Sequence, residues 1–180
     1  QSLKLINDLP KKGKKFLVVI AQRDGSIENP IKKDLFEWGT LAIVMKIFDM
    51  PDGSKSAIVQ GIDRVKLHDI THTDPYFKGL VERHHAKIVE SVELDVLTSN
   101  LRQNYSKLIE IAPYLSGEQM KIFSNVQHPG KLADRAISMM NIATSEKQEI
   151  LEELDIHQRI EKSTVIVNRE MQRLELSEKI

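Results

Sequence analysis

The sequence predicts an α+β protein in which a mainly antiparallel β subdomain precedes an α-helical bundle. Up to about residue 90, apolar residues come in short β-branched runs bounded by turn residues, which is typical of strands. From about residue 95 they recur at spacings of three and four, which is typical of amphipathic helices. The 180 residues, 41% of them hydrophobic, suffice for one compact domain or two small ones. We therefore expect a β unit over residues 1–90 and a helical unit over residues 91–180.

The first half is expected to form a small antiparallel sheet that curls towards a barrel. Pro51-Asp52-Gly53 offers the fixed φ and the positive φ of a tight turn, so the longest strand should form a hairpin with the strand after it. Gly61 in the returning strand indicates a bulge or a close backbone approach. The expected strands cover residues 16–22, 38–48, 56–62, 63–70 and 79–89.

The second half is expected to form five helices. The first begins near residue 95 and ends before a proline. Ser116 and Ser145 each begin an S-x-x-Q capping box, in which the serine and glutamine side chains satisfy free backbone N–H groups. Another helix should follow His128-Pro129-Gly130, and the last should run from a cap at Asp155 to the final residue without Pro or Gly.

The last expected helix, residues 155–180, would be about 39 Å long and has one apolar face. The face consists of Ile156, Ile160, Val167, Met171 and Leu174. It could pack on the preceding helices, or its distal end could leave the domain as a coiled coil or an interdomain strut. We expect self-association through this helix, with four contact residues: Ile160, Val167, Met171 and Leu174.

Composition and motifs exclude several classes of function. The sequence has no cysteine, so disulfides, cysteine-ligated metals and thiol catalysis are ruled out. It contains no phosphate-binding glycine loop, no G-x-S-x-G, no H-E-x-x-H and no apolar run long enough to span a membrane. His84 and His85 would point to opposite faces of a strand, so they cannot readily share one ion. We expect no catalytic residue, no metal and no cofactor in this chain.

Charge gives only a local clue to a partner, because 26 basic residues balance 26 acidic ones. A nucleic-acid or anionic-membrane binder usually carries an excess of positive charge. The one dense basic cluster is Lys11-Lys12-Gly13-Lys14-Lys15, which either is a solvated loop or contacts phosphates or an acidic peptide. Aromatic residues near the expected strand ends should divide between the core and an exposed apolar patch.

Five motifs occur in a fixed order along the chain. Three lie in the β half. In the first, residues 34–42, acidic residues and a Gly-Thr pair lead into a strand. The others are Met-Pro-Asp-Gly at residues 50–53 and a Gly-x-x-Arg element within residues 59–65. Two lie in the helical half: Pro-Gly-Lys-Leu-Ala-Asp at residues 129–134 and Glu-Lys-Gln-Glu-Ile-Leu-Glu at residues 146–152. Together they resemble the amino-terminal domain of Lon, the ATP-dependent serine protease of bacteria and mitochondria, over nearly the whole chain.

This resemblance implies a PUA-like β-barrel followed by a helical bundle whose long last helix leads to an AAA+ ATPase module and a Ser/Lys protease module. Neither module is in the sequence, so ATP and Mg²⁺ would bind elsewhere in a longer protein. The family's first strand is also missing, because Leu9-Pro10 follows the initial helix, and we expect a trimmed chain with an incomplete barrel. The resemblance further implies a bacterial-type cytoplasmic protein that assembles into homo-hexamers and binds no membrane.

The resemblance also implies a non-catalytic domain that recognises substrates and helps to organise the oligomer. Its substrates would be unfolded or degron-bearing proteins, which share exposed apolar residues rather than one sequence, so apolar side chains of the β half are the candidate contacts. These candidates are Phe36, Trp38, Met50, Tyr76 and Phe77. The alternative is a PUA-like nucleic-acid-binding module, which the balanced charge and the lack of a basic and aromatic face disfavour.

Overall fold

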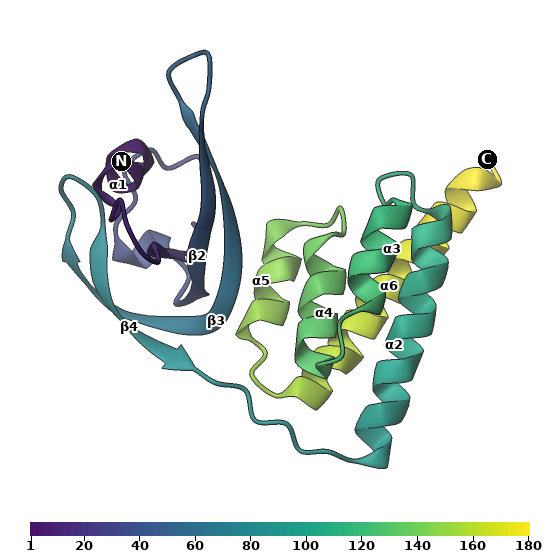
Figure 1. Ribbon diagram of the computed structural model, residues 1–180. Coiled ribbons are helices and arrows are strands. Elements are labelled where there is room, and N and C mark those ends of the chain that lie inside the picture. Colours follow the sequence, from purple (N-terminus) through teal and green to yellow (C-terminus); the bar gives the residue numbers. More distant parts are fainter. The chain divides into compact units, whose positions relative to one another are not determined.

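The computed structural model describes residues 1–180, which form two compact units, Gln1–His85 and Ala86–Ile180. The predicted α+β class is confirmed, because the first unit holds one antiparallel sheet and the second holds only helices (Figure 1). Each unit has its own buried apolar residues. We call them the β unit and the helical unit.

The β unit is a four-stranded sheet with one helix before it. Its strands lie in the order β1-β2-β3-β4, and every neighbouring pair is antiparallel. The sheet curls but stays open, with β1 and β4 at its edges. The elements are α1 (Ser2–Asp8), β1 (Phe16–Val19), a 3₁₀ turn (Lys32–Asp34), β2 (Trp38–Asp49), β3 (Lys55–His72) and β4 (Lys78–His84).

The β2–β3 hairpin turns where the sequence predicts. Gly53 has φ +83°, and the Met50 N–H donates to the Ser54 carbonyl at 2.9 Å. The Asp52 carboxylate accepts the Ser54 N–H, also at 2.9 Å. Since β1 pairs only with the beginning of β2 and β4 only with the end of β3, residues 45–58 form a two-stranded ribbon that projects from the sheet (Figure 1).

The strand boundaries differ from the prediction mainly in β3. Residues 56–62 and 63–70, expected as separate strands, are one strand. Leu41 pairs with Asp63 and Ala42 with Gly61, so Ile62 is an extra residue in a bulge at the place where Gly61 indicates one. A bulge bends a strand without ending it, which is why the glycine does not separate two strands. The first and last expected strands are also shorter, because β1 ends at Val19 and β4 at His84.

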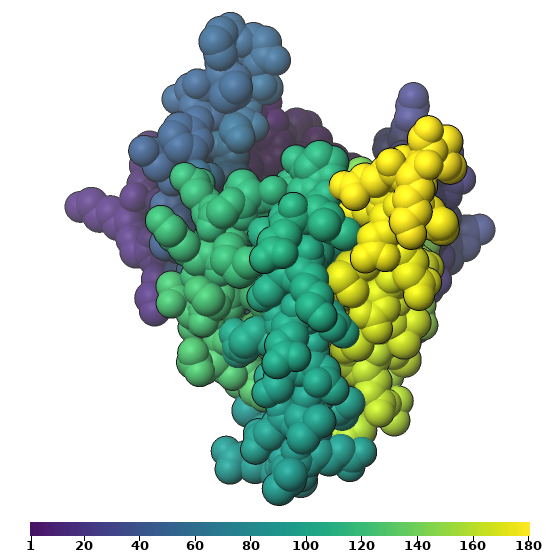
Figure 2. Space-filling view, turned by 90° about the vertical axis from the view of Figure 1, so that its right-hand side faces the viewer, coloured from purple at the N-terminus to yellow at the C-terminus, as the bar shows by residue number.

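The helical unit contains the five helices expected. Helices α2 and α6 run in the same direction along each other, since Glu93 contacts His157 and, further along, Asn104 contacts Asn168. Figure 2 shows them side by side, α2 in teal and α6 in yellow. The helices are α2 (Val92–Ile111), α3 (Gly117–Ser124), α4 (Pro129–Ser138), α5 (Thr144–Glu152) and α6 (Ile156–Glu178).

Side-chain caps begin α3 and α6 as predicted, and α4 has a cap that the sequence did not predict. Ser116 and its partner Gln119 form the expected capping box of α3, and His128 accepts the Lys131 N–H in front of α4. Asp155 accepts the Gln158 N–H at the start of α6. The second expected capping box was wrong. Helix α5 begins at Thr144, with extended Ala143 in the cap position, so Ser145 already lies inside the first turn and cannot cap it.

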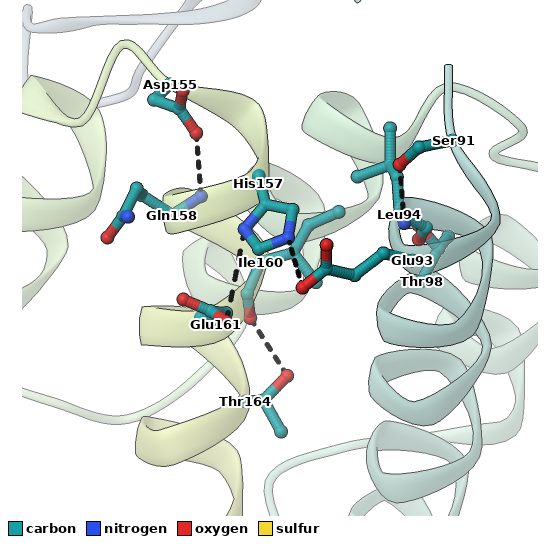
Figure 3. Close-up of polar contacts among 10 residues, drawn as sticks. All are labelled: Ser91, Glu93, Leu94, Thr98, Asp155, His157, Gln158, Ile160, Glu161 and Thr164. Atoms are coloured by element: carbon teal, nitrogen blue, oxygen red, sulfur yellow. Dashed lines mark hydrogen bonds and ion pairs between the residues drawn. The ribbon is translucent and has the colours of Figure 1, made fainter. Parts of the chain in front are cut away.

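A polar cluster joins the first turns of α2 and α6 (Figure 3). His157 Nε2 lies 3.2 Å from Glu93 Oε1 of α2, and His157 Nδ1 lies 3.9 Å from Glu161 Oε1 one turn further along α6. Ser91 and Asp155 cap the two helices beside it. The cluster therefore fixes the common starting level of the two helices.

A buried arginine accounts for the Pro-Gly-Lys-Leu-Ala-Asp motif. Arg159 of α6 is 1% exposed, and its Nε donates to the Glu153 carbonyl at 2.9 Å. Its Nη1 lies 3.5 Å from the Asp134 carboxylate. A Cβ at position 130 would lie 2.9 Å from the same Nη1, so the glycine of the motif makes room for the arginine and the aspartate balances its charge.

The apolar face of α6 mostly packs inside the helical unit, which corrects the expected self-association surface. Ile160 and Val167 are fully buried in the core and cannot contact a second molecule. Met171 and Leu174 are half-buried at its border, and residues 175–180 are exposed. Packing on the preceding helices is thus the explanation of most of the stripe. No helix of the structure has both the length and the apolar content needed to cross a bilayer.

Candidate functional site

The five apolar residues predicted to contact substrate all lie in the β unit but have different surroundings. Met50 is exposed at the hairpin turn, whereas the other four are half-buried. The guanidinium of Arg23 lies 4.8 Å from the Phe36 ring centroid. The Trp38 ring stands edge-on to the His84 ring, 5.9 Å away. These aromatic side chains are thus held by neighbours of the β unit itself.

Tyr76 connects the β3–β4 loop with the end of α1. Partial burial raises the pKa of its phenol, and the hydrogen bond and negative charge of Asp8 raise it further. The Lys78 ammonium lies 5.7 Å from the centroid of the same ring. Tyr76 therefore stays neutral at physiological pH.

A set of exposed apolar side chains, of which the sequence singled out only Met50, lies on the β2–β3 ribbon and the strands at its base. Met45 is 59% exposed and Ile58 54%. Other exposed members are Phe16, Phe48, Met50 and Val59. Apolar side chains exposed together in this way are typical of an interaction surface.

The strand register places several of these residues on one face. Paired residues of antiparallel strands point to the same side, and alternate residues of one strand do so too. Along β3, residues 56, 58 and 60 pair with Phe48, Lys46 and Ile43, and Ile43 pairs in turn with Phe16 of β1. We call Phe16, Ile43, Lys46, Phe48 and Ile58 the ribbon face. The opposite face carries the buried residues Ala42 and Val44.

A sequence pattern could have located the ribbon but not its exposure. Residues 43–48 are apolar except for Lys46, and such a continuous run is typical of a strand covered on both faces. In the structure Val44 pairs with Val59 and Lys46 with Ile58, so Met45 is an extra residue in a bulge of β2. This bulge shifts the alternation, so Val44 and Lys46 point to opposite faces. Lys46 was the only residue of this run that indicated exposure of the strand to solvent.

The lysine cluster of residues 11–15 lies next to the base of the ribbon. Gly13 has φ +81°, which forms a tight turn in the cluster. The Lys15 carbonyl accepts the Val44 N–H at 2.8 Å, and the ribbon-face residue Phe16 follows directly. In the ribbon face itself, the Lys46 ammonium lies 4.8 Å from the centroid of the Phe48 ring. The site therefore combines apolar side chains with positive charge.

Two shallow depressions of the surface are smaller than a usual small-molecule site. One shallow pocket of about 170 Å³ lies between α1 and the hairpin turn, and its apolar lining is Leu3 and Ile6. Another of about 230 Å³ lies between α5 and α6 beside Val165. Small-molecule sites usually enclose about 300 Å³ or more. No three His, Asp or Glu side chains are grouped to hold a metal ion.

Comparison with known families gives this geometry a context. Residues 1–169 match the family model described as the ATP-dependent protease La (LON) substrate-binding domain. The chain belongs to the Lon substrate-binding domain family. The Lon protease of Dictyoglomus thermophilum is 32% identical over 180 residues, and that of Koribacter versatilis is 33% identical over 181 residues. The alignments cover 100% and 99% of this chain but 22% of each relative, so this Lon domain spans about a fifth of their length.

Solved structures agree on the fold. The N-terminal domain of the Lon protease of the Mycobacterium avium complex superposes with a TM-score of 0.59 at 16% identity, covering 84% of this chain and 90% of that one. A Lon N-terminal domain protein from Xanthomonas campestris has a TM-score of 0.50 at 13% identity, covering 86% and 89% of the two chains. Similarity at these identities supports the fold alone.

Proposed function

We propose that this Lon domain captures unfolded or degron-bearing polypeptides for an ATP-dependent protease, and that the ribbon face is its main contact surface. The observation that carries the proposal is the exposure of Met45, Phe48 and Ile58 on a ribbon that projects from the sheet. An unfolded chain exposes apolar side chains in many different sequences. A projecting apolar surface without a deep pocket can bind such segments because it requires no single shape.

The five residues predicted from the sequence enter this proposal in two ways. Met50 is exposed at the turn of the ribbon and extends its apolar surface. Phe36, Trp38, Tyr76 and Phe77 are half-buried, so we assign to their exposed edges a secondary contribution to binding. Replacing Trp38 and Phe77 by serine tests this assignment. Weaker client binding per folded molecule supports it, and a lost fold with unchanged affinity contradicts it.

The test of the ribbon face is the double substitution Phe48→Ser and Ile58→Ser. Both side chains are exposed, so the free energy of unfolding should change by less than about 0.5 kcal/mol for each. The affinity for a permanently unfolded, fluorescently labelled client should fall about tenfold or more, since central apolar contacts dominate such interfaces. Fluorescence anisotropy measures the affinity, and urea unfolding measures the stability.

A matched control removes exposed apolar surface from the helical unit. Val96 of α2 and Val165 of α6 are 53% and 67% exposed, and their replacement by serine should leave client affinity unchanged. Equal losses in both double variants would mean that binding follows total apolar exposure rather than the ribbon. Unchanged affinity in the ribbon variant would contradict the proposal.

The longer protein is part of the same proposal. We infer an ATP-dependent serine endopeptidase of the bacterial cytoplasm whose ATP and Mg²⁺ bind outside residues 1–180, and whose subunits form a homo-hexamer. This Lon domain helps to organise that oligomer through the distal end of α6. Support for this role comes from Met171 and Leu174 at the border of the core and from exposed Leu176 after them. Analytical ultracentrifugation of the full-length protein should show weaker assembly when Leu174 and Leu176 are replaced by serine.

A further inference from the structure

We propose that the ribbon face prefers apolar substrate segments flanked by acidic residues, with the side chains of Lys11, Lys12, Lys14 and Lys46 contacting the acidic groups. This inference rests on the proposed function and names the substrate class of the same site. Apolar contacts would anchor the segment along the ribbon. The lysines would select among apolar segments by the charge beside them.

These four lysines have no carboxylate partner within the domain, although the Lys46 ammonium lies over the Phe48 ring. Lys11, Lys12, Lys14 and Lys46 are exposed, and none of them forms an ion pair in the structure. Lys55, at the turn end of the ribbon, is different, since its Nζ lies 2.9 Å from the Asp49 carboxylate. An unpaired, solvated ammonium can bind a partner's carboxylate without first breaking an internal bond.

The local charge around the ribbon face is positive. Residues 11–16, 43–48 and 56–60 carry five lysines and no carboxylate. The nearest acidic side chains in sequence are Asp49, Asp8 and Asp63, and the last two are engaged by Tyr76 and Arg83. Asp49 pairs with Lys55, and Asp52 accepts hydrogen bonds from Ser54, which lower the pKa of its carboxyl group. An acidic segment would therefore meet attraction at the base of the ribbon and no repulsion along it.

The lysines lie close to the apolar residues of the ribbon face. The Lys15 carbonyl bonds the Val44 N–H, so the lysine loop is fixed beside the strand that enters the ribbon. Lys14 lies two residues before Phe16, and Lys46 lies on the ribbon face itself. Apolar and positive groups thus alternate over one continuous surface. A peptide that places an apolar side chain on Phe16 or Ile58 would bring its neighbours within reach of a lysine.

A single-stranded nucleic acid could use the same lysines, but the surface between them favours a polypeptide. Non-specific nucleic-acid binders stack successive bases on exposed aromatic rings. Here Ile43 and Ile58 are aliphatic, and the Lys46 ammonium already lies over the Phe48 ring. Only Phe16 remains as an uncovered aromatic ring of the ribbon face, which is too few for a stacking platform.

The test uses three short fluorescent peptides with the same apolar centre and with glutamate, serine or lysine flanks. Each exposed ammonium–carboxylate pair changes affinity by about two- to fivefold, so two or three such pairs should make the glutamate peptide bind about tenfold more tightly than the serine peptide. The lysine peptide should bind more weakly than either. Added salt should reduce the preference because these charges are exposed to solvent.

Substitution of the four lysines by glutamine should abolish the preference. In the variant Lys11→Gln, Lys12→Gln, Lys14→Gln, Lys46→Gln, the glutamate and serine peptides should bind equally, and the affinity for the serine peptide should be unchanged. The corresponding arginine variant keeps the charge and should keep the preference. A control with four exposed lysines of the helical unit replaced loses the same net charge and should behave like the wild type. Its substitutions are Lys87→Gln, Lys107→Gln, Lys121→Gln and Lys131→Gln.

The possible outcomes separate this inference from the function on which it rests. If the wild type binds the glutamate and serine peptides equally, while the ribbon variant Phe48→Ser, Ile58→Ser binds neither, the charge preference is wrong and substrate capture stands. If the wild type binds no apolar peptide, both are wrong. If oligothymidine binds more tightly than the glutamate peptide and loses its affinity with the same four lysines, the surface belongs to a nucleic-acid partner and the inference is overturned.

Discussion

Gly39, the glycine of the Gly-Thr motif, shows how one residue determines the entry to β2. A Cβ at this position would lie 2.4 Å from the Val19 carbonyl oxygen and 2.4 Å from Ile20 Cγ1, so only glycine lets the two chain segments approach. Gly39→Ala is expected to lower the free energy of unfolding of the β unit by about 3 kcal/mol, because the backbone of Val19 must move. Urea unfolding followed by Trp38 fluorescence measures this loss.

The matched control for this prediction is Gly25→Ala. Position 25 has open space around it and no positive φ, so the alanine variant should be as stable as the wild type. Similar stabilities of the two alanine variants would show that the sheet can shift without cost and that the close approach does not matter.

The lowered pKa of Glu170 makes the stability of the helical unit depend on pH. The hydrogen bonds from Arg173, followed by that from Tyr114, lower the pKa of its carboxyl group, although its burial opposes them. Since the folded pKa lies below the unfolded one, the stabilisation is complete above the unfolded pKa of about 4.3 and is lost as the pH falls through the folded pKa. Glu170→Gln should therefore cost about 1.5 kcal/mol at neutral pH and much less in acid.

Thermal unfolding of both proteins across this pH range measures the difference. Glu178→Gln serves as the control, because Glu178 is exposed at the end of α6. A difference between wild type and Glu170→Gln that stays constant from neutral to acidic pH would contradict the assigned ion pair.

At the scale of an element, α6 divides into a core part and a free end. Ile166, Val167 and Glu170 are buried, whereas residues 175–180 are exposed. A chain ending after Glu161 should lose the helical fold, because the core would lose the buried residues of α6 that pack against α2. A chain ending after Leu174 should keep its free energy of unfolding within about 0.5 kcal/mol of the full chain. Far-ultraviolet circular dichroism distinguishes these outcomes, and a folded helical unit in the shorter chain would contradict them.

The elements also show what can be predicted from the sequence. The helices were predictable because their signals are local: apolar spacing, the caps at Ser116 and Asp155, and the following proline or glycine. Strand ends were harder to predict. The single strand β3 looks like two strands in the sequence, because a bulge interrupts its pattern. The ribbon face was missed because exposure of a strand depends on the number of its neighbours, which no local pattern records. The same limit placed Phe36 and Trp38 among exposed candidates although the structure half-buries them.

At the scale of the whole molecule, the two units differ in the size of their cores. Eighteen buried apolar residues form the core cluster of the helical unit. In the β unit only five apolar residues are buried: Leu35, Ala42, Val44, Val65 and Leu67. Burial of apolar area is the main stabilising contribution to folding, so the helical unit should be the more stable of the two.

We therefore predict that residues 86–180 fold alone. The fragment should give a helical circular-dichroism spectrum and a cooperative thermal transition close to that of the helical unit in the whole chain. The separate fragment 1–85 should unfold at a lower temperature. Failure of fragment 86–180 to fold would show that its stability depends on the β unit.

The bulge at Met45 also constrains how this surface can change during evolution. Because the extra residue lies between Val44 and Lys46, deleting Met45 would restore regular alternation and keep Lys46 and Phe48 on the outward side. Deleting Ile47 would instead turn Phe48 towards the buried side. Aligned relatives should accordingly tolerate a one-residue gap at position 45 but none at position 47, so that the surface can lose its extra apolar side chain without exchanging the rest of its composition.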